Sequence, residues 1–439
     1  MTEPALALLG GEAYRAYAYS YPHKTAYRPF ARERSIVNLF AQEPRDALSL
    51  YLHVPFCERR CGYCNLFARS GASRDEHDAY LAALERQARS IARALPGARF
   101  ARLAVGGGTP AVLGAEGLER LLDIADRILG APPAKQPTSV ELSPASCRPE
   151  ILALLEASGV SRVSLGLQSF DEGEARAVGR LQTRAELEEA LDRIRARRFA
   201  VVNLDLMYGL PGQDERSLEE SLLAALRFRP EELYLYPLYV RPGTALAERA
   251  PPAGGVPRRA LYQFARDLLC AAGYRQRSMR HFALPGEGEQ PADHRCQEDG
   301  MVGLGCGARC YTRSVHWCEP FAVDQGGIAA ILAAYVRRSE DAFERARHGY
   351  DLDHEDERRR TVILTLLSEG LDAPAYRARF GSDPMADLPE LALLAEHGLA
   401  RSDAAGMQLT ALGLELSDAI GPFLFSAAVR ARMAEEVAA

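Results

Sequence analysis

The sequence predicts an α/β fold with six parallel strands, closed into a partial barrel or open and doubly wound, followed by a mostly helical C-terminal domain. Three observations predict it. Short strands alternate with amphipathic helices between residues 48 and about 240. The connections are long enough to require parallel pairing with right-handed crossovers. Polar residues also follow the strands, where parallel sheets build their sites.

The predicted strands are rich in Val, Leu and Tyr. They span 48–54, 100–105, 138–142, 162–168, 201–207 and 232–239. Charged amphipathic helices are predicted between them, at 74–95, 115–129, 148–158, 183–198 and 214–228. Thr183-Arg184-Ala185-Glu186 has the pattern of a capping box, so it predicts the N-terminus of the fourth helix.

Two further regions flank this repeating pattern, giving expected domains at 1–46, 47–345 and 346–439. Residues 1–46 are rich in tyrosine and predict an extended or partly helical arm, whose rings are expected to cover apolar surface rather than contact a substrate. The last region predicts a winged-helix-like outline. Its expected elements are helices at 356–367, 373–380, 387–398 and 411–437 and a strand at 407–410.

Composition excludes several classes of protein. Hydrophobic residues make up 47% of the 439 residues and charged residues 26%, as in ordinary soluble proteins. The net charge of −6 gives no reason to expect nucleic-acid binding. The last region is not strongly basic, whereas phosphate contacts need Lys or Arg, so we expect a lid or scaffold there. No signal peptide or membrane span is predicted, so we expect a cytoplasmic protein.

Three of the nine cysteines lie in one loop after the first predicted strand. Cys57, Cys61 and Cys64 have the spacing C-x3-C-x2-C. A [4Fe–4S] cluster is normally held by four thiolates, so three would leave one iron open to another ligand. Structural zinc with His53 as the fourth ligand is an alternative, although zinc sites more often pair two C-x2-C knuckles. A disulfide framework is disfavoured in a reducing cytoplasm.

A second cysteine group lies later in the chain. It comprises Cys296, Cys306, Cys310 and Cys318, with His294 and His316 nearby in sequence. These spacings match no usual zinc or cluster rule, so free or partly buried thiols are favoured over a second metal site.

Unusual residues stand at the end of each predicted strand. They include the run Gly106-Gly107-Gly108-Thr109-Pro110, Glu141 in an apolar context, Gln168, and Asn203 with Asp205. Buried carboxylates and amides cost several kcal/mol unless they are partnered. A polar ligand bound in a shared cavity would supply those partners.

Taken together, these motifs resemble the radical S-adenosylmethionine (SAM) superfamily, and within it the oxygen-independent coproporphyrinogen III oxidase family, which includes heme chaperones and some methyltransferases. The family-specific part is the glycine run, the Gln168 stretch and Asp205-Leu206-Met207-Tyr208-Gly209-Leu210-Pro211-Gly212. The resemblance implies a partial (β/α)6 TIM-like barrel, a [4Fe–4S] cluster and SAM as cofactors, and a 5′-deoxyadenosyl radical.

The resemblance also implies site residues. The cluster ligands would be Cys57, Cys61 and Cys64. The SAM-binding residues would be Tyr51, Tyr63, Gly107, Gly108, Thr109, Glu141, Gln168, Arg180 and Asp205. Simpler interpretations stay open: the glycines form an ordinary turn, or Glu141 pairs with Arg102 or Arg162. For Arg180, a solvated helix position and a cofactor contact are weighed equally.

The implied reaction is the oxidative decarboxylation of coproporphyrinogen III, a tetrapyrrole, with an electron donor such as a flavodoxin or a reductase. The alternatives are a heme-binding chaperone and a two-SAM methyltransferase or cyclopropanase. Two departures matter: Leu66 stands where the oxidases have a further cysteine, and 294–299 lacks the chaperones' His-Asn-x-x-Tyr-Trp stretch. A cationic rim for substrate carboxylates is expected among Arg241, Arg277, Arg280 and Arg309.

Overall fold

Six parallel strands form the centre of the computed structural model, which describes residues 2–15, 17–18, 20–249, 256–286 and 294–438. These strands are β2 (Leu48–Val54), β5 (Phe100–Gly107), β6 (Thr138–Leu142), β7 (Arg162–Gln168), β8 (Val201–Tyr208) and β9 (Glu232–Pro237). They pair in that order, each parallel to the next. All six were predicted, with ends displaced by at most two residues.

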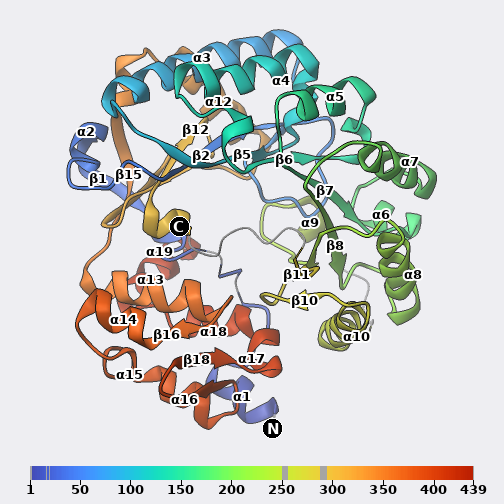
Figure 1. The fold of residues 1–439 in the computed structure, drawn as a ribbon, viewed down its shortest axis with the longest axis vertical. Helices are drawn as coiled ribbons and strands as arrows, with labels where there is room; N and C mark the ends of the chain where they lie inside the picture. Colours follow the sequence, from blue (N-terminus) through green and yellow to red (C-terminus); the bar gives the residue numbers. More distant parts are fainter. Residues whose placement is uncertain (1, 16, 19, 250–255, 287–293, 439) are drawn as a thin grey trace.

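Helices cover only the outer face of these strands, so the sheet is a partial barrel and not a doubly wound sheet (Figure 1). The main covering helices are α3 (Arg74–Ala94), α4 (Gly114–Asp123), α5 (Pro149–Ala157), α7 (Arg184–Arg195), α8 (Glu215–Leu226) and α10 (Arg258–Ala271). The predicted capping box opens α7: Glu186 N–H donates to Thr183 Oγ1 at 3.3 Å, and Thr183 N–H donates to Glu186 Oε2 at 2.7 Å.

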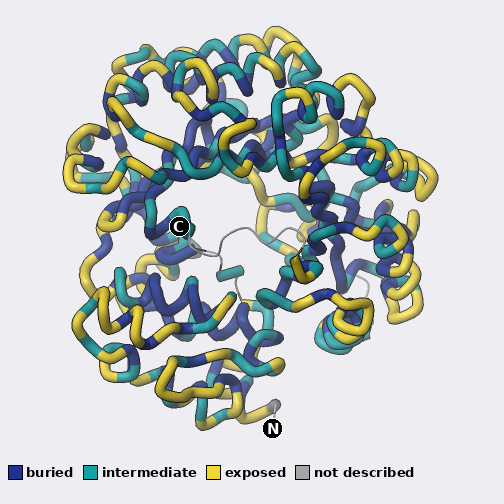
Figure 2. Tube along the Cα trace, viewed as in Figure 1, coloured by how far each residue is buried: buried dark blue, intermediate teal, exposed yellow. Residues whose placement is uncertain are grey.

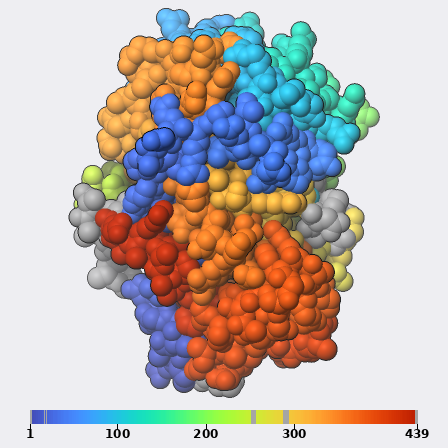
Figure 3. All heavy atoms as spheres, turned by 90° about the vertical axis from the view of Figure 1, so that its left-hand side faces the viewer, coloured from blue at the N-terminus to red at the C-terminus, as the bar shows by residue number. Residues whose placement is uncertain are grey.

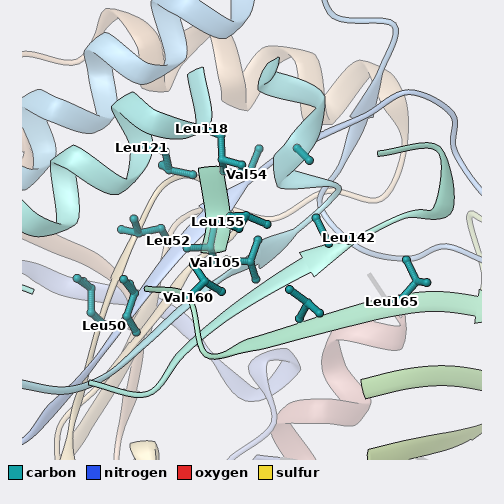
Figure 4. Close-up of a cluster of buried hydrophobic side chains, with 14 of the residues drawn as sticks. Leu50, Leu52, Val54, Val105, Leu118, Leu121, Leu142, Leu155, Val160 and Leu165 are labelled. Atoms are coloured by element: carbon teal, nitrogen blue, oxygen red, sulfur yellow. The ribbon is translucent and has the colours of Figure 1, made fainter. Parts of the chain in front are cut away.

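The barrel core lies between the strands and this helical layer (Figure 4). Leu50, Leu52 and Val54 of β2 and Leu118 and Leu121 of α4 are at most 1% exposed. Burying each such side chain stabilises the fold by roughly 1.5–3 kcal/mol. Buried residues run along the strands while the outer helices carry the exposed ones (Figure 2), so burial fixes the register that brings the strand ends together.

Seven more strands extend the sheet at its two edges within the described residues. Beyond β2 lie β12 (Met301–Leu304), β13 (Arg309–Tyr311), β14 (Val315–Cys318), β15 (Arg345–Asp351) and β1 (Arg28–Ser35); beyond β9 lie β11 (His281–Ala283) and β10 (Arg275–Gln276). Only β12 pairs in parallel, with β2. The antiparallel strands were not predicted, because most have two to four residues and show no clear alternation.

The N-terminal arm is more ordered than predicted. It contains α1 (Thr2–Leu8), β1 and α2 (Ile36–Leu39), and β1 pairs with β15 from the far end of the chain. Figure 3 shows this N-terminal segment lying against C-terminal segments. The domain limits after residues 46 and 345 stay predictions. The pairing of β1 with β15 links the N-terminal arm to the strand that crosses the second limit.

The C-terminal region contains helices around a three-stranded sheet of β16, β18 and β17. Its elements are α13 (His354–Leu366), β16 (Leu371–Asp372), α14 (Ala373–Phe380), α15 (Pro384–Asp387), α16 (Glu390–Glu396), β17 (Ala400–Ser402), β18 (Gly406–Leu409), α17 (Ala411–Glu415), α18 (Ser417–Phe423) and α19 (Ala427–Ala438).

The prediction of one continuous helix over 411–437 is wrong. Three helices occupy this stretch because tertiary contacts turn the chain. Glu415 accepts hydrogen bonds from Arg259 and Gln263, Asp418 pairs with Arg280, and Ser426 Oγ donates to Asp356. Across the described part of the chain, every helix falls short of the length and apolar character that crossing a bilayer requires.

Candidate functional site

The cysteine loop follows β2 at the carboxyl end of the barrel. Its backbone is held from two sides: Gly62 N–H donates to Val178 O, and Leu246 N–H donates to Gly62 O, both at 2.8 Å. Arg60 also donates to Cys64 O at 3.0 Å. All three thiols are half-buried. The loop is therefore shaped by backbone contacts that leave its three cysteines partly exposed.

The environment of Cys57 and Cys64 favours their protonated thiols. Burial raises the pKa of Cys57 to about 12, although Thr109 Oγ1 donates to its Sγ at 3.8 Å, and burial also raises the pKa of Cys64. The positive charge of Arg180 opposes both shifts. Metal ligation requires thiolates and releases their protons, so bound iron would have to displace the protons of Cys57 and Cys64.

His53 does not complete a zinc site. Its Nε2 lies 3.0 Å from Phe67 O and its Nδ1 lies 3.1 Å from the hydroxyl of Tyr51, so both ring nitrogens already have partners. Among the described residues, no three His, Cys, Asp or Glu side chains are arranged to hold a single metal ion. Each thiolate of a [4Fe–4S] cluster binds a different iron, so cluster ligands need not converge on one point.

The glycine run brings β5 against the cysteine loop. Gly107 has φ +112°, a conformation that favours glycine, and its N–H donates to Glu141 Oε2 at 3.0 Å. A Cβ on Gly108 would lie 2.2 Å from Phe56 O and 3.0 Å from Cys57 Sγ. Close packing inside the protein thus already requires these glycines, and it places the adjacent Thr109 beside Cys57.

The ion pair of Arg162 is formed with Glu232, at 2.8 Å, and not with Glu141. The positive charge of Arg162 still opposes the rise in the pKa of Glu141. Glu141 keeps exposed surface although it lies deep in the fold, because it faces the interior of the barrel. Burial raises its pKa to about 7, and the negative charge of Asp205 adds to the rise.

Asp205 lies on β8 and is held by Asn203, two residues earlier on the same face of the strand. Asn203 Nδ2 donates to Asp205 Oδ1 at 2.9 Å and to Ser164 Oγ at 2.5 Å. Burial raises the pKa of Asp205 to about 6, and the Asn203 hydrogen bond opposes the rise. Asn203 Oδ1 is buried without a hydrogen-bond partner. The pair therefore retains hydrogen-bonding capacity for a ligand.

Gln168 and Arg180 come together beside Gly166. Gln168 has φ +72° where β7 and β8 change register. Arg180 Nη1 donates to Gly166 O at 2.6 Å. Burial alone would lower the pKa of Arg180, but contacts with Tyr63 and Cys61 raise it. The interpretation of Arg180 as a solvated helix residue is therefore wrong: it lies between helices and links β7 to the cysteine loop.

The structure thus gathers the predicted site residues at the carboxyl ends of β2, β5, β6, β7 and β8. Sequence analysis missed the Arg162–Glu232 pair at the other end of these strands, where Arg162 Nη1 also donates to Ser139 Oγ at 2.9 Å. Arg162 and Ser164 are two residues apart on β7, as Asn203 and Asp205 are on β8. This two-residue spacing was the signal that they share the interior face.

A cavity of about 500 Å³ opens beside this site, at the carboxyl ends of β8 and β9. Its wall includes Tyr14 of the arm, Tyr239, Arg241, Arg258 and Leu246. None of the loop cysteines lines it, although Leu246 binds Gly62 of their loop. The cavity therefore adjoins the cysteine loop without containing it.

Among the described residues, Cys296, Cys306, Cys310 and Cys318 are not arranged to hold a single metal ion. Cys306 and Cys310 are buried thiols, and Cys296 and Cys318 are half-buried. Cys310 Sγ lies 3.3 Å from Gly303 O, and burial raises its pKa to about 12. The preference for thiols over a second metal site at these residues stays a prediction.

Comparisons with known proteins agree with this geometry. Residues 51–225 match the model of the radical SAM superfamily, and residues 352–416 match the HemN C-terminal domain. An oxygen-independent coproporphyrinogen III oxidase of Paracoccus denitrificans is 30% identical, over 91% of each chain. The heme chaperone HemW of Mycobacterium tuberculosis is 32% identical, over 75% of this chain and 90% of the relative.

The fold comparison covers nearly the whole molecule. The structure of coproporphyrinogen III oxidase (HemN) from Escherichia coli has a TM-score of 0.81 and 25% identity, covering 93% of this chain and 97% of that one. These matches imply a [4Fe–4S] cluster and SAM as the cofactors. The chain therefore belongs to the radical SAM superfamily, in the family of the oxygen-independent coproporphyrinogen III oxidases and HemW heme chaperones.

Proposed function

We propose that the protein is a radical SAM enzyme that oxidises a coproporphyrinogen-like tetrapyrrole. When bound, the cluster and SAM supply a 5′-deoxyadenosyl radical that removes a hydrogen atom from the substrate. The observation that carries the proposal is the match to an oxidase over 91% of both chains, together with a fold match over 93% of this chain. Relatives named as chaperones match smaller shares, from 60% to 86% of this chain.

The residues of the site have distinct roles in this proposal. Cys57, Cys61 and Cys64 hold the cluster, and Tyr51, Tyr63, Gly107, Gly108 and Thr109 line the approach to SAM. Glu141 accepts hydrogen bonds from SAM, and Gln168, Arg180 and Asp205 contact its ribose or carboxylate. Support comes from their convergence: Thr109 touches Cys57, Arg180 contacts Cys61 and Tyr63, and Gly107 donates to Glu141.

An external donor must supply the electron, and we propose a flavodoxin or a reductase for this role. Both the oxygen-sensitive cluster and the nine cysteines favour a reducing cytoplasm. The half-exposed cysteine loop would let a donor come close.

One observation favours the chaperone as a second candidate. Leu66, where the oxidases have a further cysteine, is 50% exposed and lies in the cysteine loop. A protein that binds heme and performs no radical chemistry would not need a cysteine at this position.

Anaerobic assay separates the two candidates. Protein reconstituted with iron and sulfide receives SAM, dithionite and coproporphyrinogen III, and mass spectrometry follows the products. The proposal predicts 5′-deoxyadenosine together with a tetrapyrrole that has lost carboxyl groups. Tight heme binding with no 5′-deoxyadenosine would establish the chaperone instead.

A further inference from the structure

Thr109 is the N-cap residue of a short 3-10 helix, Pro110–Leu113, but its side chain makes no hydrogen bond to that helix. An N-cap threonine usually accepts a hydrogen bond from a backbone N–H in the first turn of its helix. Three other N-cap threonines of the chain, Thr183, Thr244 and Thr410, do so. The side chain of Thr109 is therefore directed away from its own helix.

The hydroxyl of Thr109 donates instead to the sulfur of Cys57, with Oγ1 and Sγ 3.8 Å apart. The backbone fixes this contact. Thr109 N–H donates to Phe56 O at 2.7 Å, and Gly108 N–H donates to Val54 O at 2.8 Å. These two hydrogen bonds attach the end of β5 to the residues that lead into the cysteine loop, so the Thr109 side chain is held beside Cys57.

Arg180 acts on the cysteine loop from another side. Its segment packs on Gly62, which lies between the second and third cysteines. Val178 O accepts from Gly62 N–H at 2.8 Å, and a Cβ added to Gly179 would lie 3.1 Å from Gly62 N. The guanidinium of Arg180 hydrogen-bonds Cys61. Two of the three cysteines thus receive a hydrogen bond from a side chain that lies outside their loop.

Neither side chain is needed to hold the loop in place. Backbone hydrogen bonds already join β5 to residues 54–56 and residue 178 to Gly62. A neutral thiol is also a weak acceptor, so both donors should contribute little to the fold without metal. They become important when the sulfur atoms are ionised, because a hydrogen bond to a charged group is roughly twice as strong as a neutral one.

The reduction potential of an iron–sulfur cluster depends on its net charge, its exposure to solvent and the hydrogen bonds to its sulfur atoms. An added electron makes the thiolates more negative. A hydrogen-bond donor therefore stabilises the reduced cluster more than the oxidised one and raises the reduction potential. A guanidinium acts in the same direction as a hydroxyl and adds the attraction of a full positive charge.

We propose that Thr109 and Arg180 set the reduction potential of the cluster by donating hydrogen bonds to the sulfur atoms of Cys57 and Cys61. This rests on the cluster of the proposed function and deepens it, because both residues then act on the cluster as well as on SAM. They act through the cysteines: the external donor supplies one electron to the cluster, and no covalent bond of Thr109 or Arg180 forms or breaks.

Potentiometric titration of the reconstituted protein without SAM tests the proposal, with the reduced cluster followed by electron paramagnetic resonance. Thr109→Val removes the hydroxyl and keeps the branched shape. At the potential that reduces half of the clusters in the original protein, the ratio of reduced to oxidised cluster should fall about three- to tenfold, as expected for one lost hydrogen bond. Arg180→Gln, which also removes a charge, should lower this ratio further.

Two kinds of control accompany these variants. Thr109→Ser and Arg180→Lys retain a donor and should titrate close to the original protein. Thr244→Val is the matched control: Thr244 begins the helical turn that contains Leu246, whose N–H donates to Gly62 O at 2.8 Å. The hydroxyl of Thr244 donates to a backbone carbonyl and not to a sulfur. This variant disturbs only the support of the loop, so its reduction potential should stay unchanged.

Unchanged potentials in Thr109→Val and Arg180→Gln, at full iron content, would overturn the proposal, as would an equal shift in Thr244→Val. Urea denaturation of the metal-free variants shows whether they fold, and Arg180→Gln decides alone if Thr109→Val does not. A folded Thr109→Val protein that assembles no cluster would also contradict the proposal, because Thr109 would then be required for assembly.

The outcome is separable from the proposed function. If SAM and dithionite give no 5′-deoxyadenosine while both variants shift the potential, the role of Thr109 and Arg180 stands and the enzyme assignment fails. If 5′-deoxyadenosine forms and the potentials do not move, the enzyme assignment stands and this role fails.

Discussion

Carboxylates in two regions of the molecule are used differently, although the protein shields both sets from bulk water. At the seam where the C-terminal helices contact the barrel and the arm, Asp418 binds Arg280 through both oxygens at 2.6 Å. Asp356 there accepts hydrogen bonds from Tyr21 at 2.6 Å and Tyr350 at 2.9 Å. At the strand ends, Glu141 and Asp205 accept one hydrogen bond each in the described structure.

This difference separates a structural role from a binding role. A carboxylate has about four lone-pair sites, and the seam acids use theirs within the protein. The strand-end acids keep most of theirs, and burial raises their pKa values to about 7 and about 6. Changes at the strand ends should therefore affect cofactor binding and spare stability, while changes at the seam should do the reverse.

The largest expected effect is at the cysteine loop. Cys61→Ala should abolish cluster assembly, because a cluster that already lacks a fourth thiolate would keep only two. The urea midpoint of the metal-free protein should hardly change, since Cys61 is half-buried. Iron content and visible absorbance measure the first effect. Cys270→Ala, an exposed cysteine on α10, is the control and should load normally.

At the seam, Asp418→Ala should lower the free energy of unfolding by about 3–5 kcal/mol, because it leaves Arg280 buried and unpaired. Cluster loading should persist. Urea denaturation of the metal-free protein gives the value. Arg74→Ala provides the comparison, since the Arg74–Glu116 pair is 78% and 82% exposed and should contribute at most about 1 kcal/mol. Equal losses of unfolding free energy in the two variants would show that the Asp418–Arg280 pair stabilises the fold no more than an exposed pair does.

The pH dependence of stability and of SAM binding should distinguish the strand-end acids, Glu141 and Asp205, from the seam acids. Both acids have raised pKa values, so the folded protein holds their protons more tightly than the unfolded chain does. Their contribution to stability therefore falls as pH rises from about 4 to about 7. Because SAM would contact the ionised forms, its affinity should increase over the upper part of that range.

Calorimetric titration of cluster-loaded protein with SAM at pH 5.5, 6.5 and 7.5 tests this. Glu141→Gln should weaken binding at pH 7.5 about tenfold, by removing a charged acceptor, and flatten the profile. A steep, unchanged profile in this variant would show that Glu141 does not contact SAM.

The smallest expected effect concerns Asn203. Asn203→Ala removes the hydrogen bond that favours ionised Asp205, so the pKa of Asp205 should rise and SAM binding should reach its plateau at higher pH. We expect a few-fold loss of affinity at pH 6.5 and little loss at pH 8. Ser164→Ala, which removes only the other partner of Asn203, should shift the profile less.

The sequence predicted the parallel strands because each has a buried, apolar pattern: β2, β6 and β7 begin and end at the predicted residues. The same pattern identified Glu141, Asn203 and Asp205 as polar residues inside the barrel. It could not reveal the pairing of β1 with β15, which depends on contacts more than 200 residues apart. The breaks after Glu415 and Phe423 were hidden for the same reason, since contacts with the barrel and the arm determine them.

The most direct test of the account is the composition and reactivity of the cysteine-loop centre after anaerobic reconstitution. The account predicts about four iron and four sulfide ions per chain, lost in Cys57→Ala, and release of 5′-deoxyadenosine when SAM and dithionite are added. A colourless protein with one zinc ion per chain, and no 5′-deoxyadenosine, would contradict it.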